Sequence, residues 1–307
     1  MTTSDETVAA PAAVRTDVAA LAAVLVTVAA WGSAFVGIRA AGEALSPGPL
    51  ALGRLIVSLA ILGTVAAVRR EPLPGRRDLL WIAAFGVLWL AVYSVALNEA
   101  ERRVDAGTAA MLVNTGPILI AIFAGIFLRE GFRPGLFAGC GVAFCGVVVI
   151  GLATAESGAR SGLGVVLCIV AAVAYAVAVV VQKPVLARIS SFQVTWLGLA
   201  AATIACLPFA PATLATEAAR ADASTIGWTI YLGVVPTALG FAAWAFALRR
   251  TSAGRMGSIT YLAPPVAILL GWAVLGETPP WLAAAGGALC LAGVALARRP
   301  SRRKQQP

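Results

Sequence analysis

Residues 162–182 read GLGVVLCIVAAVAYAVAVVVQ, a stretch of 21 residues without a charged side chain. A helix of about 20 apolar residues is long enough to cross a bilayer core about 30 Å thick. This stretch therefore predicts a transmembrane helix.

The composition extends this interpretation to the whole chain. Of the 307 residues, 60% are hydrophobic and 12% are charged, and the mean hydropathy is +0.90. Soluble chains are about 45–50% apolar and about 25% charged, and a soluble protein this apolar could not cover its surface with polar groups. We predict an all-α polytopic membrane protein. The composition argues against water-soluble enzymes, nucleic-acid-binding proteins and disordered proteins.

Ten apolar runs of suitable length follow one another along the chain. They predict transmembrane helices near residues 18–37, 47–68, 79–99, 106–128, 132–152, 162–182, 190–210, 226–248, 257–275 and 280–297. Residues 1–17 are predicted to be a disordered cytoplasmic tail, and residues 298–307 a basic cytoplasmic tail.

The placement of charge predicts the orientation, because cytoplasmic loops are enriched in Lys and Arg. With the N-terminus inside, 17 of the 23 basic residues lie in cytoplasmic segments and five in outer segments. Both termini are therefore predicted to be cytoplasmic, in a multi-pass protein of a bacterial-type plasma (inner) membrane. The net charge of +9 is assigned to loops beside anionic lipid headgroups and not to nucleic-acid binding.

Residue types that carry chemistry are scarce. The chain has no histidine, and its five cysteines lie inside apolar runs, where they are expected to pack as small hydrophobic side chains. No Cys-x-x-Cys, Gly-rich phosphate loop or nucleophile elbow occurs. We expect neither an enzyme, nor a metal site, nor a cofactor, and no obligatory protein partner is evident.

An internal repeat organises the ten predicted helices. Residues 81–147 align without a gap to residues 228–294, with 17 of 67 positions identical. The informative matches pair Trp81 with Trp228, Arg102-Arg103 with Arg249-Arg250, Pro117 with Pro264, and Glu130 with Glu277. An offset of 144 pairs Trp31 with Tyr175 in the first helix of each half.

We therefore predict two five-helix repeats, at residues 18–152 and 162–297. Because five is odd, the second repeat must cross the membrane in the opposite sense to the first. Inverted repeats are typical of secondary transporters, whose substrate site lies between the halves near the midplane. The alternative interpretation is that the duplication only enlarges the helix bundle and has no role in transport.

The sequence resembles the drug/metabolite transporter superfamily, specifically its EamA type. The resemblance rests on Trp31-Gly32-Ser33-Ala34-Phe35, Arg54, Ala106-Gly107-Thr108-Ala109-Ala110, Pro117, Arg129-Glu130, Ala253-Gly254, Pro264-Pro265 and Gly276-Glu277. It covers residues 18–297 and implies ten helices, two EamA domains and export or exchange of small metabolites. Within the family, the chain looks most like the amino-acid and metabolite exporters.

Polar and aromatic side chains inside apolar helices are the candidate substrate-binding residues, because polar groups in hydrocarbon need partners. They are Trp31, Ser33, Tyr93, Asn98, Asn114, Tyr175, Trp244 and Tyr261. Anchoring at the membrane interface is the alternative role for Trp and Tyr.

Pro117 and Pro264 are predicted to be paired mid-span kinks that act as hinges, since proline removes a helical hydrogen bond. Static packing kinks are the alternative. Glu130 and Glu277 are expected to cap or pair locally, and Gly135 with Gly139 is expected to form a helix-packing motif.

Arg54 lies about seven residues inside its predicted span, where a cation is costly. It could stabilise the outer end of the bundle or attract a substrate carboxylate; the structural role is favoured.

The leading hypothesis is an exporter of small metabolites, with amino acids foremost, that works by alternating access in the lipid bilayer. It would use no buried-carboxylate proton relay, because every acidic residue falls in a tail, a loop or the last turn of a span. A drug or sugar-conjugate exporter is an alternative of the same class. A non-transporting membrane scaffold is an alternative of another class.

Overall fold

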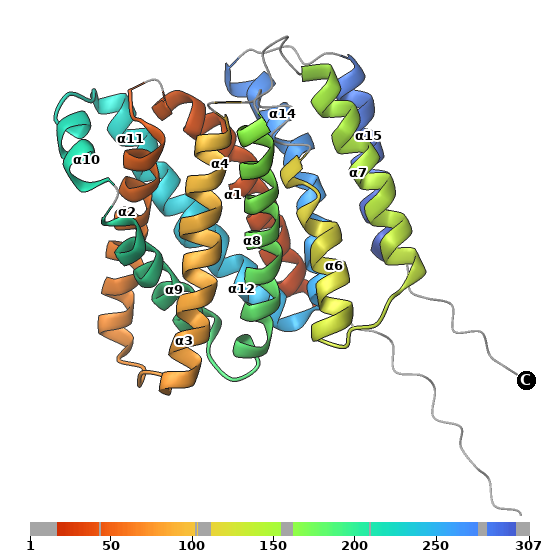
Figure 1. Cartoon of the computed structure of the whole chain (residues 1–307), viewed down its shortest axis with the longest axis horizontal. Coiled ribbons are helices and arrows are strands. Elements are labelled where there is room, and N and C mark those ends of the chain that lie inside the picture. Colours follow the sequence, from red (N-terminus) through yellow and green to blue (C-terminus); the bar gives the residue numbers. More distant parts are fainter. Residues whose placement is uncertain are drawn as a thin grey trace, which may run out of the picture.

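The computed structural model describes residues 17–42, 44–101, 103, 112–154, 162–208, 210–275 and 281–298. These residues form a bundle of helices that stand side by side (Figure 1), and no strand occurs among them. Of the predicted tails at residues 1–17 and 298–307, residues 1–16 and 299–307 lie outside the described residues.

The first half of the chain contains helices α1 (Val18–Gly42), α2 (Pro47–Arg69), α3 (Arg76–Phe85), η1 (Gly86–Tyr93), α4 (Ser94–Glu101), α6 (Gly116–Phe127) and α7 (Pro134–Thr154). The second half contains α8 (Gly162–Leu186), α9 (Ser191–Cys206), α10 (Pro211–Ala218), α11 (Ala223–Leu232), η2 (Gly233–Leu239), α12 (Gly240–Arg250), α13 (Ala253–Ile259), η3 (Thr260–Leu262), α14 (Ala263–Leu275) and α15 (Trp281–Arg298).

Within the described residues, five helical stretches are long and apolar enough to cross a membrane: Val18–Gly42, Pro47–Arg69, Arg76–Leu97, Gly162–Leu186 and Ala223–Arg250. Large aliphatic side chains remain exposed on several of them, among them Ile61, Val65, Val166 and Ile169. An exposed apolar surface of this kind suits contact with lipid rather than water.

Local sequence explains where several helices begin. Proline occupies the first turn of α2, α6 and α10, where its missing N–H is not needed. Ser190, Asp222 and Ser252 cap α9, α11 and α13 by accepting backbone N–H bonds. The hydrogen bonds from the Thr225 side chain and backbone lower the pKa of the Asp222 carboxyl.

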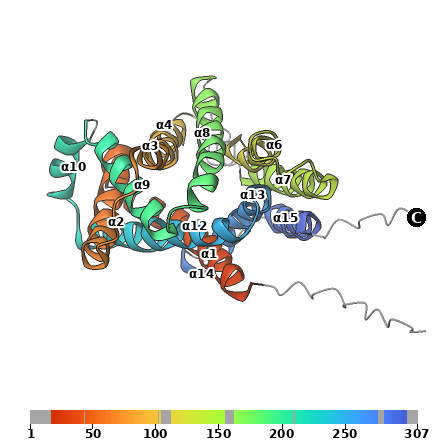
Figure 2. The same ribbon diagram turned by 90° about the horizontal axis from the view of Figure 1, so that it is seen from below.

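The first helix of each half packs mainly against the other half. Helix α1 contacts α11, η2, α12 and α14, whereas α8 contacts α3, η1, α4 and α6. Figure 2, viewed along the bundle from below, shows α1 beside α12 and α14 and shows α8 between α4 and α6. The two halves are therefore interlocked.

Helices α7 and α15 form a tight antiparallel pair (Figure 1) built on small residues. A Cβ added to Gly146 would lie 2.7 Å from the backbone nitrogen of Cys290, and one added to Gly293 would lie 2.3 Å from that of Ala143. The offset of 147 pairs Gly146 with Gly293 and Ala143 with Cys290. Each contact is therefore the repeat equivalent of the other, as a two-fold relation between the helices requires.

The glycine motif predicted on this pair is half correct. Gly139 meets Ala297, whose backbone nitrogen would be 2.4 Å from an added Cβ. Gly135 lies in the first turn of α7, and no atom lies within 4 Å of a Cβ added there, so it packs against no other helix.

Two π-helical segments, η1 and η2, start at Gly86 and Gly233, which are 147 residues apart. A Cβ on Gly86 would lie 2.1 Å from the carbonyl oxygen of Gly198 in α9, and a Cβ on Gly233 would lie 2.9 Å from that of Arg54 in α2. Glycine allows the close backbone approach at both crossings. Neither π segment was predicted from the sequence.

A turn of the chain lies just before Pro117. The chain turns at residues 114–115, and Pro117 is the second residue of the new helix α6. Proline is compatible with this position, whereas it would break hydrogen bonding inside a helix. Pro264 is likewise the second residue of its helix, α14, and follows the 3-10 turn η3. Helix α10 was not predicted at all.

Candidate functional site

Aromatic side chains from both halves gather where α1, η1, α8 and α12 meet. The ring of Trp89 lies 5.7 Å from Trp31, 5.1 Å from Phe241, 5.2 Å from Trp244 and 4.7 Å from Tyr175, measured between centroids. We call these five residues the aromatic cluster. Edge-to-face and tilted pairs of this kind stabilise each other beyond simple burial.

Hydrogen bonds fix two indoles of the aromatic cluster. Trp31 Nε1 donates to the Pro236 carbonyl in η2 over 3.2 Å, and Trp244 Nε1 donates to Gln182 Oε1 over 3.1 Å. Gln182 is fully buried, and its Nε2 has no hydrogen-bond partner. The aromatic cluster is thus tied to α8 on one side and to η2 on the other.

The π segment η2 presents displaced carbonyl groups to its neighbours. Pro236 cannot donate to the carbonyl of Leu232, which instead accepts from Thr237 Oγ1 over 2.7 Å. Ser58 Oγ donates to the Gly233 carbonyl over 2.7 Å. Together with Trp31, these bonds join α1 and α2 to η2.

Several predicted substrate-binding residues lie at or beside the aromatic cluster. Trp31 and Tyr175 belong to it, and the ring centroid of Tyr93, at the end of η1, is 6.1 Å from that of Tyr175. The Tyr175 hydroxyl donates to Thr260 Oγ1 over 3.4 Å. Ser33 accepts a hydrogen bond of 2.7 Å from the hydroxyl of Tyr231.

Other predicted residues are placed differently. Trp244 also belongs to the aromatic cluster but is fully enclosed. Tyr261 is fully enclosed in a separate hydrophobic core beside α7 and α15, and its hydroxyl is buried without a hydrogen-bond partner. Asn114 is half-buried in the turn before α6. The side chain of Asn98, in α4, lies outside the described residues.

Three central residues were missed in the sequence: Trp89, Phe241 and Thr237. The sequence did offer a signal for Trp89, since it aligns with Pro236 at the offset of 147 in the middle of a predicted span. Phe241 and Thr237 carry no comparable signal, because single Phe and Thr residues are common in apolar helices.

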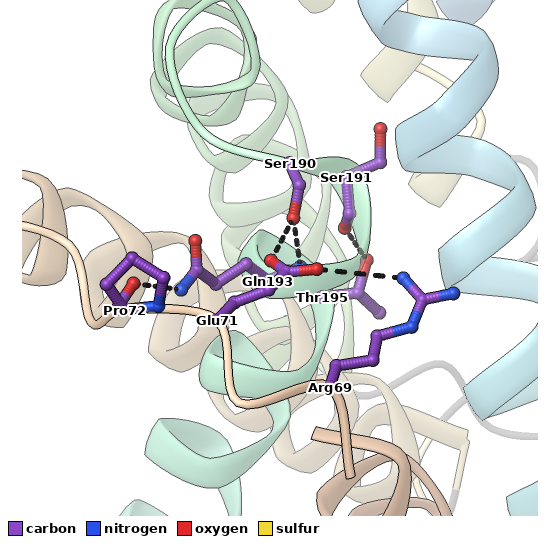
Figure 3. Close-up of polar contacts among 7 residues, drawn as sticks. All are labelled: Arg69, Glu71, Pro72, Ser190, Ser191, Gln193 and Thr195. Atoms are coloured by element: carbon purple, nitrogen blue, oxygen red, sulfur yellow. Dashed lines mark hydrogen bonds and ion pairs between the residues drawn. The ribbon is translucent and has the colours of Figure 1, made fainter. Parts of the chain in front are cut away.

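Segments that charge placement assigned to the cytoplasm meet at one end of the bundle. Ser190 Oγ donates to Glu71 Oε2 over 2.8 Å, and Gln193 Nε2 donates to the Pro72 carbonyl over 2.8 Å (Figure 3). These bonds join the α2–α3 loop of the first half to the start of α9 in the second. Arg69 adds an ion pair of 3.7 Å with Glu71.

More polar contacts lie at this end of the bundle, which we call the basic end because Arg69, Lys183 and Arg188 lie there. Arg188 of the second half pairs with Asp78 of the first at 2.5 Å. Within the second half, Lys183 Nζ donates to the carbonyls of Leu248 and Thr251. Asp17, at the start of α1, pairs with Arg250 at 3.2 Å. Polar contacts therefore hold segments of the two halves together at the basic end.

Glu130 caps a helix of the other half, whereas the sequence led us to expect a local cap or pair. Its carboxylate accepts backbone N–H bonds of 2.8 Å from Ala253 and 3.2 Å from Gly254 at the start of α13. It also borders a cavity of about 300 Å³ at the basic end, whose charged lining includes Arg133 and Arg255. Glu277 lies outside the described residues.

No group of three or more His, Cys, Asp or Glu side chains capable of holding a metal ion occurs in the part of the chain that the structure describes. The side chains of the aromatic cluster offer ring faces and hydrogen-bonding groups for recognition.

Comparison with known proteins gives related sequences over most of the chain. A "Probable terminal-alkyne amino-acid exporter" of Streptantibioticus cattleyicolor is 39% identical over 253 residues, which are 81% of this chain and 83% of that protein. The "Uncharacterized transporter YdfC" of Bacillus subtilis is 30% identical over 82% of each chain. A "Probable amino-acid metabolite efflux pump" of Salmonella typhimurium is 25% identical over 80% of this chain and 84% of that protein.

A solved crystal structure matches the fold with a TM-score of 0.76 at 22% identity, covering 94% of this chain and 100% of that one. The EamA-like transporter family model matches residues 18–152 and again residues 162–299. With its apolar helices and these relatives, the chain is a multi-pass membrane transporter for a small molecule and belongs to the EamA-like transporter family.

Proposed function

We propose that this transporter exports small metabolites, with amino acids as the leading class, by alternating access across the inner membrane. The observation that carries the proposal is the aromatic cluster, which lies where α1 of the first half meets α8 and α12 of the second. Aromatic faces attract ammonium groups and bury apolar side chains, so a ligand that carries both features suits the position.

The names of two relatives support the substrate class. One is named as a probable amino-acid exporter and another as a probable amino-acid metabolite efflux pump, and each aligns over 80% or more of this chain. Of the predicted residues, Trp31, Tyr93 and Ser33 are half-buried and are proposed to contact substrate in this conformation. Asn98, Asn114, Tyr175, Trp244 and Tyr261 remain proposed members of the site in other conformations of the cycle.

We further propose ten membrane spans in two inverted repeats, with both termini in the cytoplasm. The exchanged packing of α1 and α8, the paired glycine contacts of α7 and α15, and the two π segments support this arrangement. In this scheme, opening toward the cytoplasm requires the polar contacts at the basic end to separate, including the bond from Ser190 to Glu71.

Export is proposed to proceed without a buried-carboxylate proton relay. Among the described residues, the acidic side chain farthest along a span is Glu99, which is 36% exposed and paired with Arg103 at 2.5 Å. Proton-coupled transporters commonly rely on intramembrane carboxylates or histidines. Substrate would move down its own gradient or in exchange.

Uptake into inverted membrane vesicles tests the proposed substrate class. Vesicles that contain the protein should accumulate at least one member of a panel of labelled amino acids faster than vesicles without it. Trp31→Ala should reduce that rate at least tenfold. A protein that is well folded and carries no amino acid of the panel would contradict the proposal.

A further inference from the structure

Arg54 is a cation inside a membrane-spanning helix without an acidic partner. Its Nε donates to Thr237 Oγ1 over 3.0 Å. None of the ion pairs in the described part of the chain involves Arg54. Its two terminal nitrogens make no hydrogen bond in the described part of the chain. They are not among the fully buried side-chain atoms that lack a hydrogen-bond partner. Arg54 is half-buried, and its guanidinium therefore keeps donors that no other group of the described chain uses.

The bond to Thr237 fixes where the guanidinium points. Thr237 is itself fully buried and bonded to the Leu232 carbonyl, so it forms a rigid part of η2. An arginine that extends along the helix to reach lipid headgroups would keep its head group in water. Arg54 instead turns its head group toward the other half of the bundle.

The packing of the helices does not require a cation at this position. Gly233 of η2 crosses α2 at the Arg54 carbonyl, and Gly86 of η1 crosses α9 at the Gly198 carbonyl. The offset of 147 pairs Gly86 with Gly233, and the offset of 144 pairs Arg54 with Gly198. The two crossings are therefore equivalent in the repeat. The equivalent crossing therefore packs without any side chain, which argues against a purely structural role for the guanidinium.

Arg54 lies beside the aromatic cluster. Its partner Thr237 follows Pro236, whose carbonyl holds Trp31. Tyr93 lies near enough to Arg54 for an electrostatic contact, and its ring neighbours that of Tyr175. A cation with free donors and a set of aromatic faces thus lie next to each other.

Resting on the proposed function, we propose that Arg54 binds the carboxylate of the transported amino acid while the ammonium group lies against the aromatic cluster. Arginine can offer two parallel N–H bonds to a carboxylate. The free terminal donors supply these bonds, and the aromatic rings supply a surface for the ammonium group. The site therefore selects a zwitterion over an amine or an amide.

Competition in proteoliposomes tests this assignment. For each labelled amino acid that the wild-type protein carries, its own carboxamide should compete at least tenfold more weakly than the unlabelled amino acid. Arg54→Gln should lower the flux at least tenfold and reduce the difference between the two competitors to less than twofold. Arg54→Lys should keep the preference for the carboxylate. The exposed Arg220 provides the control, and Arg220→Gln should change neither quantity.

The outcomes separate this assignment from the proposed function. If no amino acid is carried by the wild-type protein, the proposed function and the assignment both fail. If amino acids are carried but wild-type competition by the carboxamide is as strong as by the amino acid, the assignment alone fails. A monodisperse Arg54→Gln variant that keeps the wild-type preference would also overturn it. If Arg54 had only a structural role, its replacement would lower the flux but leave the preference for the amino acid over its carboxamide. The competition measured with the wild-type protein tests the assignment even if the variant does not fold.

Discussion

The indole rings of Trp31 and Trp244 stack with their centroids 5.2 Å apart and their planes at 29°. Trp31 comes from α1 and Trp244 from α12, so this stack joins the two halves of the protein. The two rings differ in environment, because Trp31 is half-buried and Trp244 is fully enclosed with its Nε1 bonded to Gln182. The difference predicts separate consequences for their replacement.

Trp244→Phe should lower stability. It removes the only hydrogen bond to the Gln182 amide in the described part of the chain and leaves a fully buried polar side chain unpaired. Such an unsatisfied group costs about 1–3 kcal/mol. Thermal unfolding in detergent should show a lower midpoint than wild type. Trp281→Phe is the control, since Trp281 is 79% exposed; equal midpoints for the two variants would contradict the account.

Gly293→Ala should also destabilise the protein, through the α7–α15 pair. The new Cβ would lie 2.3 Å from the backbone nitrogen of Ala143, so the helices must separate. Overpacking of this kind costs about 1–3 kcal/mol. Gly141→Ala on α7 is the matched control, because nothing lies within 4 Å of its added Cβ. The unfolding midpoint should fall for the first variant and stay within a degree or two, or rise, for the second.

Pro117→Ala and Pro264→Ala should affect transport more than folding. Each proline is the second residue of a helix that follows a non-α turn, so alanine creates no clash there. Alanine does allow the helix to extend backwards through the turn, which would stiffen the proposed hinge. We expect monodisperse protein with transport reduced several-fold. Wild-type flux in both variants would leave the prolines with a packing role only.

The topology can be tested with a reporter enzyme that is active only in the periplasm. Fused after Pro307, it should be inactive, because 17 basic residues lie in the segments predicted to be cytoplasmic and five in the outer ones. A second fusion in the α10–α11 segment, after Arg220, should be active. Activity of the Pro307 fusion would overturn the orientation and the even number of spans.

The sequence predicted helix positions well where apolar runs were long. The run at residues 162–182 became α8, and the predicted span at 47–68 became α2. Hydropathy could not reveal breaks inside a run, because the residues on both sides of a break are equally apolar. The turn before Pro117 and the two π segments were therefore invisible to it, as was the short helix α10.

The candidate site was only partly predictable for a related reason. Polarity inside an apolar helix singled out Trp31, Tyr93 and Tyr175, which lie at or beside the aromatic cluster. This criterion could not tell an accessible side chain from an enclosed one, so it also selected Trp244 and Tyr261, which are fully buried. Tertiary packing decides that distinction, and a single sequence does not record it.

The most direct test of the account is flux in reconstituted liposomes with and without an uncoupler. Glu99 is partly exposed and paired with Arg103, and no other acidic side chain lies deeper in the described helices. Amino-acid flux down its gradient, or in exchange, should therefore be saturable and continue when the uncoupler collapses the proton gradient, in wild type and in Glu99→Gln alike. Accumulation of substrate against its gradient only while protons flow, with loss of that accumulation in Glu99→Gln, would contradict the account.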